Sequence, residues 1–174
     1  MQLAAQGHQV TALDMSPTRL DRLRENLART NLSANIITAD ALRWQPPEAF
    51  DAVLLDAPCS ASGTLRRHPD LALNRNEGYM AKLAALQTAL LDRAAAWVKP
   101  DGVLCYAVCS LDPEEGEAQA AAFLARHKNF HLIAPQNLPQ DLLHDAMLRT
   151  TPADWPEKGG MDGFFAALFQ KTGA

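Results

Sequence analysis

Two cysteines in this sequence follow runs of apolar residues, a position from which a thiol can do chemistry. One run covers residues 49–55 and leads through Asp56-Ala57-Pro58 to Cys59, and the other covers residues 103–108 and leads directly to Cys109. Apolar runs of this kind are typical of buried parallel strands, whose carboxyl ends carry the ligand site in α/β sheets. The sequence therefore places two thiols, far apart along the chain, where strands would deliver them to a site.

Acidic residues follow several of the expected strands. Strands are expected over residues 9–13, 35–38 and 49–55, and they lead to Asp14, Asp40 and Asp56. An acid after such a strand can accept hydrogen bonds from the hydroxyls of a ribose, which suits Asp14 for a nucleoside-containing cofactor. Each acid alone could be a loop residue or a helix cap, but their recurrence at successive strand ends favours a site.

Helices are expected between the strands. Ser16 would cap a helix that starts at Pro17, the longest helix would cover residues 75–97, and Asp112 would cap another that runs to about His127. Gln87 is expected to lie largely off the buried stripe of the longest helix. A turn is expected at residues 99–102, and further strands at 103–108, 131–133 and 164–169. This alternation predicts an α/β fold with a mostly parallel sheet and helices on both of its faces.

Composition limits the class of protein. With 174 residues and 48% hydrophobic content, the chain can form the core of one domain. Its three cysteines cannot all pair, so we expect a reducing compartment and a cytoplasmic protein. Neither a signal peptide nor a membrane span is expected. The net charge of -4 argues against a protein that coats nucleic acid non-specifically, although a local basic patch can still contact phosphate.

Several segments resemble the signature segments of RNA cytosine-C5 methyltransferases that depend on S-adenosylmethionine. These segments are residues 56–63, 66–70, 106–110, 113–115 and 162–166. The closest branch is the ribosomal-RNA small-subunit methyltransferase B family, also called the Sun or Fmu family. The resemblance implies a Rossmann-like methyltransferase fold across residues 1–174, S-adenosylmethionine as cofactor, and small-subunit ribosomal RNA as substrate and partner.

The same resemblance implies roles for the candidate residues. Cys109 would be the nucleophile, Cys59 would assist product release, and Asp14, Asp40 and Asp56 would line the cofactor and cytosine site. Carbon 5 of cytosine is a poor nucleophile until a thiolate adds at carbon 6, and a second group is then needed to remove the carbon-5 proton and expel that thiolate. This chemistry explains why two thiols are needed. Asp56 is the candidate to hold a proton at ring nitrogen 3.

A basic segment is the candidate for contact with RNA. Arg66, Arg67 and His68 belong to a polar, proline-broken stretch that we expect to be an exposed loop. They could grip the RNA backbone beside a base that has left its helix, or they could merely be solvated. No metal is expected, because a zinc site made from His68 and the three cysteines lacks a close-spaced pair of ligands. Cys105 is expected to be a packing residue.

The sequence begins just after the point where the resembling family carries its first strand and a glycine-rich loop. We therefore expect a C-terminal part of the catalytic domain, in which residues 2–6 are the rest of the first helix. The sheet would be open where the first strand belongs. On this view the 174 residues alone should not methylate RNA measurably.

Other functions remain as alternatives. One is a catalytically inactive fragment that acts at most as an RNA-binding or interaction module. A DNA cytosine methyltransferase is disfavoured, since its nucleophile lies in the Pro-Cys turn and needs no counterpart of Cys109. An amino-group methyltransferase is disfavoured because its Asp/Asn-Pro-Pro-aromatic turn is replaced here by Asp56-Ala57-Pro58-Cys59.

Overall fold

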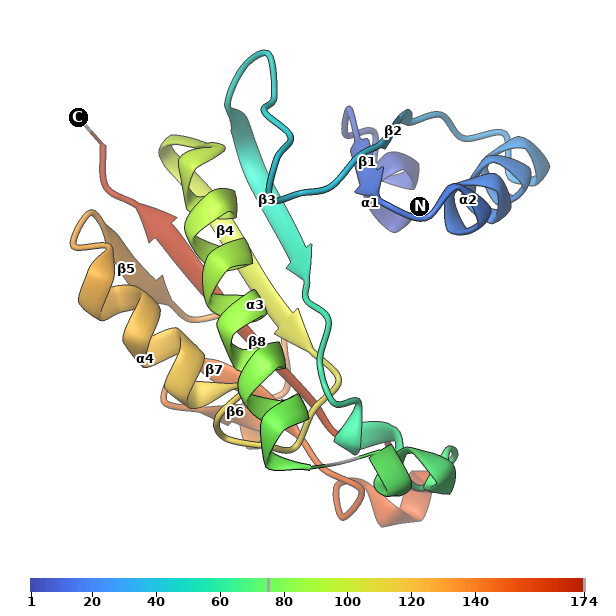
Figure 1. Cartoon of the computed structure of the whole chain (residues 1–174), viewed down its shortest axis with the longest axis vertical. Coiled ribbons are helices and arrows are strands. Elements are labelled where there is room, and N and C mark those ends of the chain that lie inside the picture. The colour runs from blue at the N-terminus through green and yellow to red at the C-terminus, as the bar shows by residue number, and fades with distance from the viewer. Residues whose placement is uncertain (75, 174) are drawn as a thin grey trace. The chain divides into compact units, whose positions relative to one another are not determined.

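The computed structural model describes residues 1–74 and 76–173 (Figure 1). Residue 75, at which the longest helix was expected to begin, lies outside the described residues. The chain forms two compact units, Met1–Pro46 and Pro47–Ala174. The predicted thiol site belongs to the second unit, and the predicted ribose contact belongs to the first.

The first unit is a small strand-helix-strand arrangement. Its elements are α1 (Gln2–Ala5), β1 (Thr11–Asp14), α2 (Pro17–Arg29) and β2 (Asn35–Thr38). β1 and β2 pair in parallel and form a two-stranded sheet. The Ser16 hydroxyl accepts a hydrogen bond from the Arg19 amide at 3.4 Å, and Pro17 is the first helical residue. The expected helix cap and both expected strands are therefore confirmed, with β1 at residues 11–14 in place of 9–13.

The second unit is built on a six-stranded sheet. Its strands are β3 (Phe50–Asp56), β4 (Val98–Val108), β5 (Phe130–Ile133), β6 (Leu143–His144), β7 (Met147–Thr150) and β8 (Phe164–Lys171). The order is β3-β4-β8-β7-β6, and β5 also pairs with β8. β3 pairs with β4 in parallel, whereas every pair made by β5 to β8 is antiparallel. The sheet of this unit is thus mixed rather than mostly parallel.

A short connection explains one of the antiparallel pairs, β6 with β7. Only Asp145 and Ala146 separate β6 from β7, and both residues have positive φ angles, 48° and 64°. Two residues with positive φ form the turn that suits a tight hairpin, while a parallel pair needs a long crossover. The hairpin therefore fixes β6 and β7 as antiparallel neighbours at the end of the sheet.

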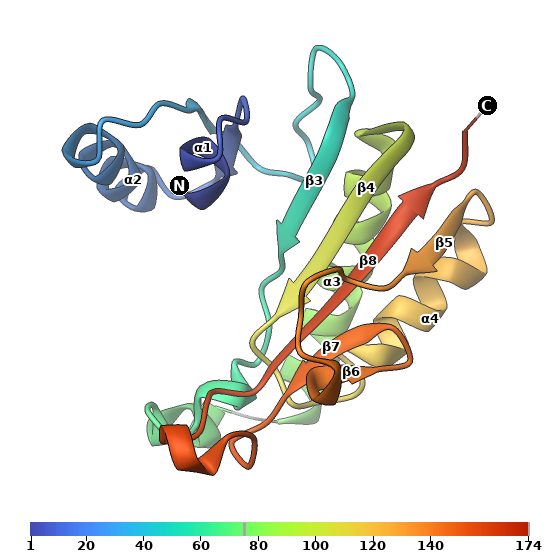
Figure 2. The ribbon, with the colours of Figure 1, turned by 180° about the vertical axis from the view of Figure 1, so that it is seen from behind.

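Two helices cover one face of this sheet. They are α3 (Glu77–Ala96) and α4 (Glu117–Arg126), and short 3-10 helices lie at Ser62–Thr64, Pro69–Asn74, Gln140–Leu142 and Pro156–Lys158. α3 and α4 lie in front of the strands in Figure 1 and behind them in Figure 2, so this unit does not carry helices on both faces as expected. The core includes Tyr106, Phe123 and Phe169, which are fully buried. In the described part of the chain, no helix has both the length and the apolar character to span a membrane.

Two expected boundaries were wrong. α4 begins at Glu117 instead of near Pro113, because residues 113–116 form a turn in which the Glu115 and Gly116 amides donate to the Asp112 carbonyl at 3.0 and 3.2 Å. β4 begins at Val98, and the expected turn at 99–102 is a bulge within that strand. The strand partners shift there, and Asp101 has a φ of 62°.

Candidate active site

Cys59 and Cys109 meet beyond the carboxyl ends of β3 and β4. Asp56, the last residue of β3, pairs with Ala107 of β4, so the parallel pair carries both cysteines to one edge of the sheet. Their Sγ atoms lie 3.5 Å apart and both side chains are half-buried. The structure therefore brings together two thiols that the sequence separates widely.

The two thiols titrate differently. A hydrogen bond from the Cys59 thiol lowers the pKa of Cys109 to about 7, in opposition to burial and to the charges of Asp56 and Glu115. The same bond, with burial, raises the pKa of Cys59 far above its ordinary value. Cys109 is therefore the more acidic thiol of the pair, and thiolates are the nucleophilic form of cysteine. Burial alone raises the pKa of Cys105 to about 11, which agrees with a packing residue.

Asp56 lies beside this thiol pair. It is exposed at the end of β3, and its negative charge is one of the influences that raise the pKa of Cys109. A carboxyl group in this place can contact a substrate that approaches Cys109. The position agrees with the predicted one, and the role of Asp56 remains a prediction.

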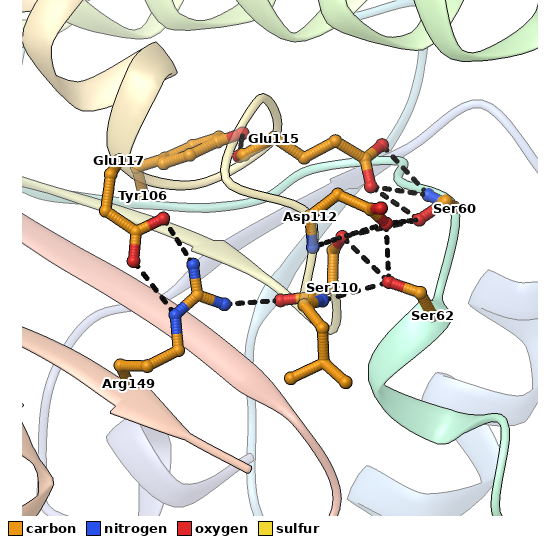
Figure 3. A network of polar contacts seen from close by, with 9 residues as sticks. Ser60, Ser62, Tyr106, Ser110, Asp112, Glu115, Glu117 and Arg149 are labelled. Carbon is orange, nitrogen blue, oxygen red and sulfur yellow. Dashed lines mark hydrogen bonds and ion pairs between the residues drawn. The ribbon is translucent and has the colours of Figure 1, made fainter. Parts of the chain in front are cut away.

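A buried network of polar groups joins the two cysteine loops (Figure 3). Ser60 and Ser110, which directly follow the cysteines, donate from their hydroxyls to the Asp112 carboxylate at 2.9 and 3.1 Å. The Ser62 hydroxyl donates to the same carboxylate at 2.6 Å. One carboxylate thus holds both loops. The Asp112 side chain was expected to cap a helix. It binds the serines of the two cysteine loops instead.

Glu115 and Gln87 hold the loop of Cys59 from below the surface. The Glu115 carboxylate accepts bonds from the Ser60 amide at 3.0 Å and the Ser60 hydroxyl at 2.6 Å. Gln87 donates to Glu115 and to the Pro58 carbonyl, both at 2.9 Å. Gln87 is fully buried, so its expected position off the buried stripe was wrong. Its position four residues after Leu83 and three before Leu90 places it on their face of the helix.

Arg149 holds the loop of Cys109 from the side of the sheet. Its guanidinium donates to the Ser110 carbonyl at 2.6 Å and to the Glu117 carboxylate at 3.0 Å (Figure 3). The same group lies 4.8 Å from the centre of the Phe165 ring. Sequence reasoning missed Arg149, because a lone arginine in the irregular tail gives no signal of a partner in another loop.

A close approach of two glycines locks these loops together. The Gly63 amide donates to the Cys109 carbonyl at 3.1 Å, and the Gly163 amide donates to the Gly63 carbonyl at 2.8 Å. A methyl group at Gly63 would collide with the backbone of Gly163. Only glycine therefore allows the segment before β8 to reach the loop that follows Cys59.

A cleft of about 570 Å³ lies beside the network, away from the reactive sulfurs. Its lining comes from the first turns of α3 and from Asp112, Glu114 and Glu115. Neither Cys59 nor Cys109 lines it. The cleft is therefore separate from the thiol site.

The acids of the first unit are held by local bonds. The Asp14 carboxylate accepts from the Ser16 amide at 2.7 Å and contacts the exposed Arg19 at 3.4 Å. The Asp40 carboxylate accepts from the Leu42 amide at 2.9 Å. Both lie at the carboxyl edge of the two-stranded sheet. Because they belong to the other unit, their part in one site with the thiols remains a prediction.

The basic segment is exposed, as expected, although a 3-10 helix begins at Pro69. Arg67 donates to the Asp162 carboxylate from its Nε at 2.7 Å, and Arg66 contacts the other oxygen of that carboxylate at 3.4 Å. These arginines lower the pKa of Asp162, with Arg67 the stronger influence. The segment thus combines exposed cations with one carboxylate that orients them.

Comparison with known proteins places this chain in a family. A family model described as 16S rRNA methyltransferase RsmB/F matches residues 1–170. The chain belongs to the RsmB/F family. Membership confirms the resemblance drawn from the cysteine-bearing segments of the sequence.

Relatives in this family are similar along almost the whole chain. The ribosomal RNA small subunit methyltransferase B of Vibrio cholerae is 41% identical over 168 residues, which cover 94% of this chain and 36% of that protein. The protein of the same name from Shewanella oneidensis is 40% identical over 169 residues, with 92% and 37% covered. This chain therefore spans little more than a third of the length of these relatives.

A solved structure supports the fold. NSun6 from Pyrococcus horikoshii, solved with SFG, matches with a TM-score of 0.82 and 27% identity. The match covers 95% of this chain and 42% of that one. This RsmB/F chain therefore has an α/β, Rossmann-like methyltransferase fold, as the sequence predicts, although the sheet of its second unit is mixed.

Proposed function

We propose that this chain carries the catalytic thiols of an enzyme that transfers a methyl group from S-adenosylmethionine to carbon 5 of a cytosine in small-subunit ribosomal RNA. The supporting observation is the thiol pair, whose sulfurs lie 3.5 Å apart, in a member of the RsmB/F family. RNA is the partner in this proposal, and the cytoplasm is the compartment. The two units together would be part of one methyltransferase domain over residues 1–174.

Cys109 performs the first chemical step. Its thiolate adds to carbon 6 of the cytosine, forming a carbon–sulfur bond and moving electron density to carbon 5 and ring nitrogen 3. The lowered pKa of Cys109 makes this thiolate available near neutral pH. Asp56, exposed beside the pair, holds a proton at ring nitrogen 3 and so stabilises the adduct. Carbon 5 is then nucleophilic enough to accept the methyl group.

Cys59 assists the release of product. After methylation, the carbon-5 proton passes to the sulfur of Cys59 as that sulfur gives its own proton to the departing sulfur of Cys109. The double bond re-forms, the carbon–sulfur bond breaks, and both cysteines end as thiols. The Cys59 thiol donates a hydrogen bond to the sulfur of Cys109, which stabilises that sulfur as it departs. One thiol attacks and the other eases departure, so the two have separate tasks.

The acids of the first unit fit the nucleoside part of S-adenosylmethionine. One oxygen of the Asp14 carboxylate, Oδ2, has only a long contact of 3.4 Å, to the exposed Arg19. This oxygen can therefore also accept hydrogen bonds from ribose hydroxyls. Asp40 has a side chain that is 41% exposed, and Asp56 would complete the set of acids around the cofactor. When bound, S-adenosylmethionine supplies a methyl group on a positively charged sulfur.

The exposed basic segment is the proposed RNA contact. Arg66, Arg67 and His68 would bind phosphates beside a cytosine that has left its stack, since a base inside a helix cannot reach a half-buried thiol. Asp162 lies beside the two arginines and forms ion pairs with both. Contact through a few cations agrees with the acidic overall charge of -4.

Variants of the two cysteines test this function. We suggest a chimera in which this chain replaces the region that it matches in the Vibrio cholerae relative. Cys109→Ala should abolish methylation, whereas Cys59→Ala should leave a covalent RNA adduct that survives denaturation. Labelled cofactor and gel analysis of the denatured protein measure both outcomes.

Cys105→Ala is the matched control, because Cys105 lies in β4 outside the thiol pair. It should retain methylation and form no stable adduct. Full activity of Cys109→Ala would refute the assignment of the nucleophile. A folded chimera that binds RNA but never transfers a methyl group would favour the interaction module instead.

A further inference from the structure

Glu115 is a buried carboxylate with no part in the bond-forming steps above. Its side chain is fully buried, and a buried charge is costly unless it is well hydrogen-bonded. In the sequence it lies near the expected start of the helix that Asp112 would cap. Its bonds reach instead across the molecule to the loop that carries Cys59 (Figure 3).

The bonds of Glu115 surround Cys59 on both sides along the chain. On the carboxyl side, the carboxylate accepts from the amide and the hydroxyl of Ser60 at 3.0 and 2.6 Å. On the amino side, it accepts from Gln87, which also donates to the Pro58 carbonyl at 2.9 Å. Tyr106 secures Glu115 itself by donating to its main-chain carbonyl at 2.6 Å. Every one of these partners except Pro58 is buried.

The loop of Cys109 has a different support. Arg149 donates to the Ser110 carbonyl at 2.6 Å and to the Glu117 carboxylate at 3.0 Å, so its bonds hold the loop of Cys109. The two thiols thus depend on two charges of opposite sign, the buried Glu115 and the partly buried Arg149. Asp112 connects the two supports through Ser60 and Ser110.

We propose that Glu115 is a positioning residue for Cys59, which it keeps within reach of the sulfur of Cys109 during product release. This inference rests on the proposed function, because it assigns Cys59 to the release step. The carboxylate is suited to this task because all of its contacts are with donors. Glutamine in its place would turn an amide NH2 group toward one of those donors and lose a bond.

The negative charge of Glu115 also works against the thiolate. It is among the influences that raise the pKa of both Cys59 and Cys109. A residue kept only to activate the nucleophile would not have this sign. The placement therefore fits a role in holding Cys59, although the charge of Glu115 slightly raises the pKa of Cys109.

The chimera described above allows a test that separates the two supports. Glu115→Gln should slow release, so the covalent RNA adduct should accumulate on the order of tenfold while adduct formation changes little. Arg149→Met should instead slow adduct formation without accumulation. Glu114→Gln is the matched control, since Glu114 is exposed and adjacent, and it should behave as the parent chimera.

A pH profile distinguishes positioning from general damage to the fold. Removal of the Glu115 charge should lower the pKa of Cys109, so the rate of adduct formation should persist to lower pH in Glu115→Gln. A merely loosened fold would lower the rate at every pH. If Glu115→Gln does not fold, Gln87→Met removes the bond to the Pro58 carbonyl and should also accumulate adduct.

The outcomes are distinct from those that test the function itself. If Cys59→Ala accumulates adduct while Glu115→Gln and Gln87→Met turn over like Glu114→Gln, the positioning role is overturned and the proposed function stands. If Cys109→Ala remains active, the proposed function fails first. Accumulation in both positioning variants, with the shifted pH profile in Glu115→Gln, supports the inference.

Discussion

The two units of this chain hold their candidate residues by different means. In the first unit only Leu20 and Leu27 are fully buried, and Asp14 and Asp40 are fixed by bonds to amides two residues away. In the second unit, β4 and β8 lie in a continuous core, and a buried network crosses between the cysteine loops. The thiols are therefore pre-positioned by tertiary structure, whereas the acids are positioned by local turns.

This difference bears on how the proposed enzyme would work. A nucleophile must approach one atom of the substrate closely, so a rigid core beneath it is an advantage. Ribose hydroxyls can be bound by a short turn whose geometry is set by nearby residues. The comparison predicts that the second unit resists perturbation and that the first depends more on its surroundings.

Hydrogen exchange should show the largest difference between the units. Amides of β4 and β8 should be protected by at least about 3 kcal/mol more than those of β1 and β2, because small units with few buried contacts open more readily. Exchange measured by mass spectrometry on the 174-residue chain gives both values. Equal protection of the two sheets would contradict the inferred difference in stability between the two units.

Gly63→Ala should be the most damaging small change in the second unit. The added methyl group would collide with the backbone of Gly163, so the free energy of unfolding should fall by about 2 to 3 kcal/mol. Gly78→Ala is the control, because its nearest neighbour would be 3.5 Å away in the first turn of α3. Urea denaturation should show no loss for the control; a harmless Gly63→Ala would contradict the close approach.

Asp14→Ala should have a smaller effect, on cofactor binding. Loss of charge-assisted bonds to ribose hydroxyls should weaken S-adenosylmethionine binding by roughly 1.5 to 3 kcal/mol in the chimera. Asp21→Ala, in the same unit on the exposed side of α2, is the control. Calorimetry that finds less than about a threefold change, with the fold intact, would remove Asp14 from the ribose contact.

Local signals made much of this structure predictable. Ser16 and Pro17 mark the start of α2, and Cys109 follows β4 directly, because caps and strand ends depend on neighbouring residues. Gln87 also had a readable signal in its spacing from Leu83 and Leu90. Arg149 did not, since its partners are set by how distant loops fold together.

The tail was the least predictable part of the fold. The strand at 164–169 was expected and is β8, but no strand was expected between residues 133 and 164, where the structure has β6 and β7. β6 has only two residues, too few for a pattern of alternation to be visible. Glu115 gave no signal for a related reason, because an acid near an expected helix start looks the same in sequence whether it faces solvent or a buried loop.

The pH dependence of alkylation tests the central claim most directly, that Cys109 is a thiolate activated by Cys59. Thiolates react with iodoacetamide and thiols do not, so a lowered pKa allows reaction to persist to lower pH. In the 174-residue chain, peptide mapping should show Cys109 modified first, with half its maximal rate near pH 7, and Cys59 and Cys105 modified only in more alkaline solution. Cys59→Ala should move the Cys109 midpoint upward, toward the ordinary cysteine value. Faster modification of Cys59 than of Cys109 at pH 7, or a Cys109 midpoint unchanged by Cys59→Ala, would contradict the account.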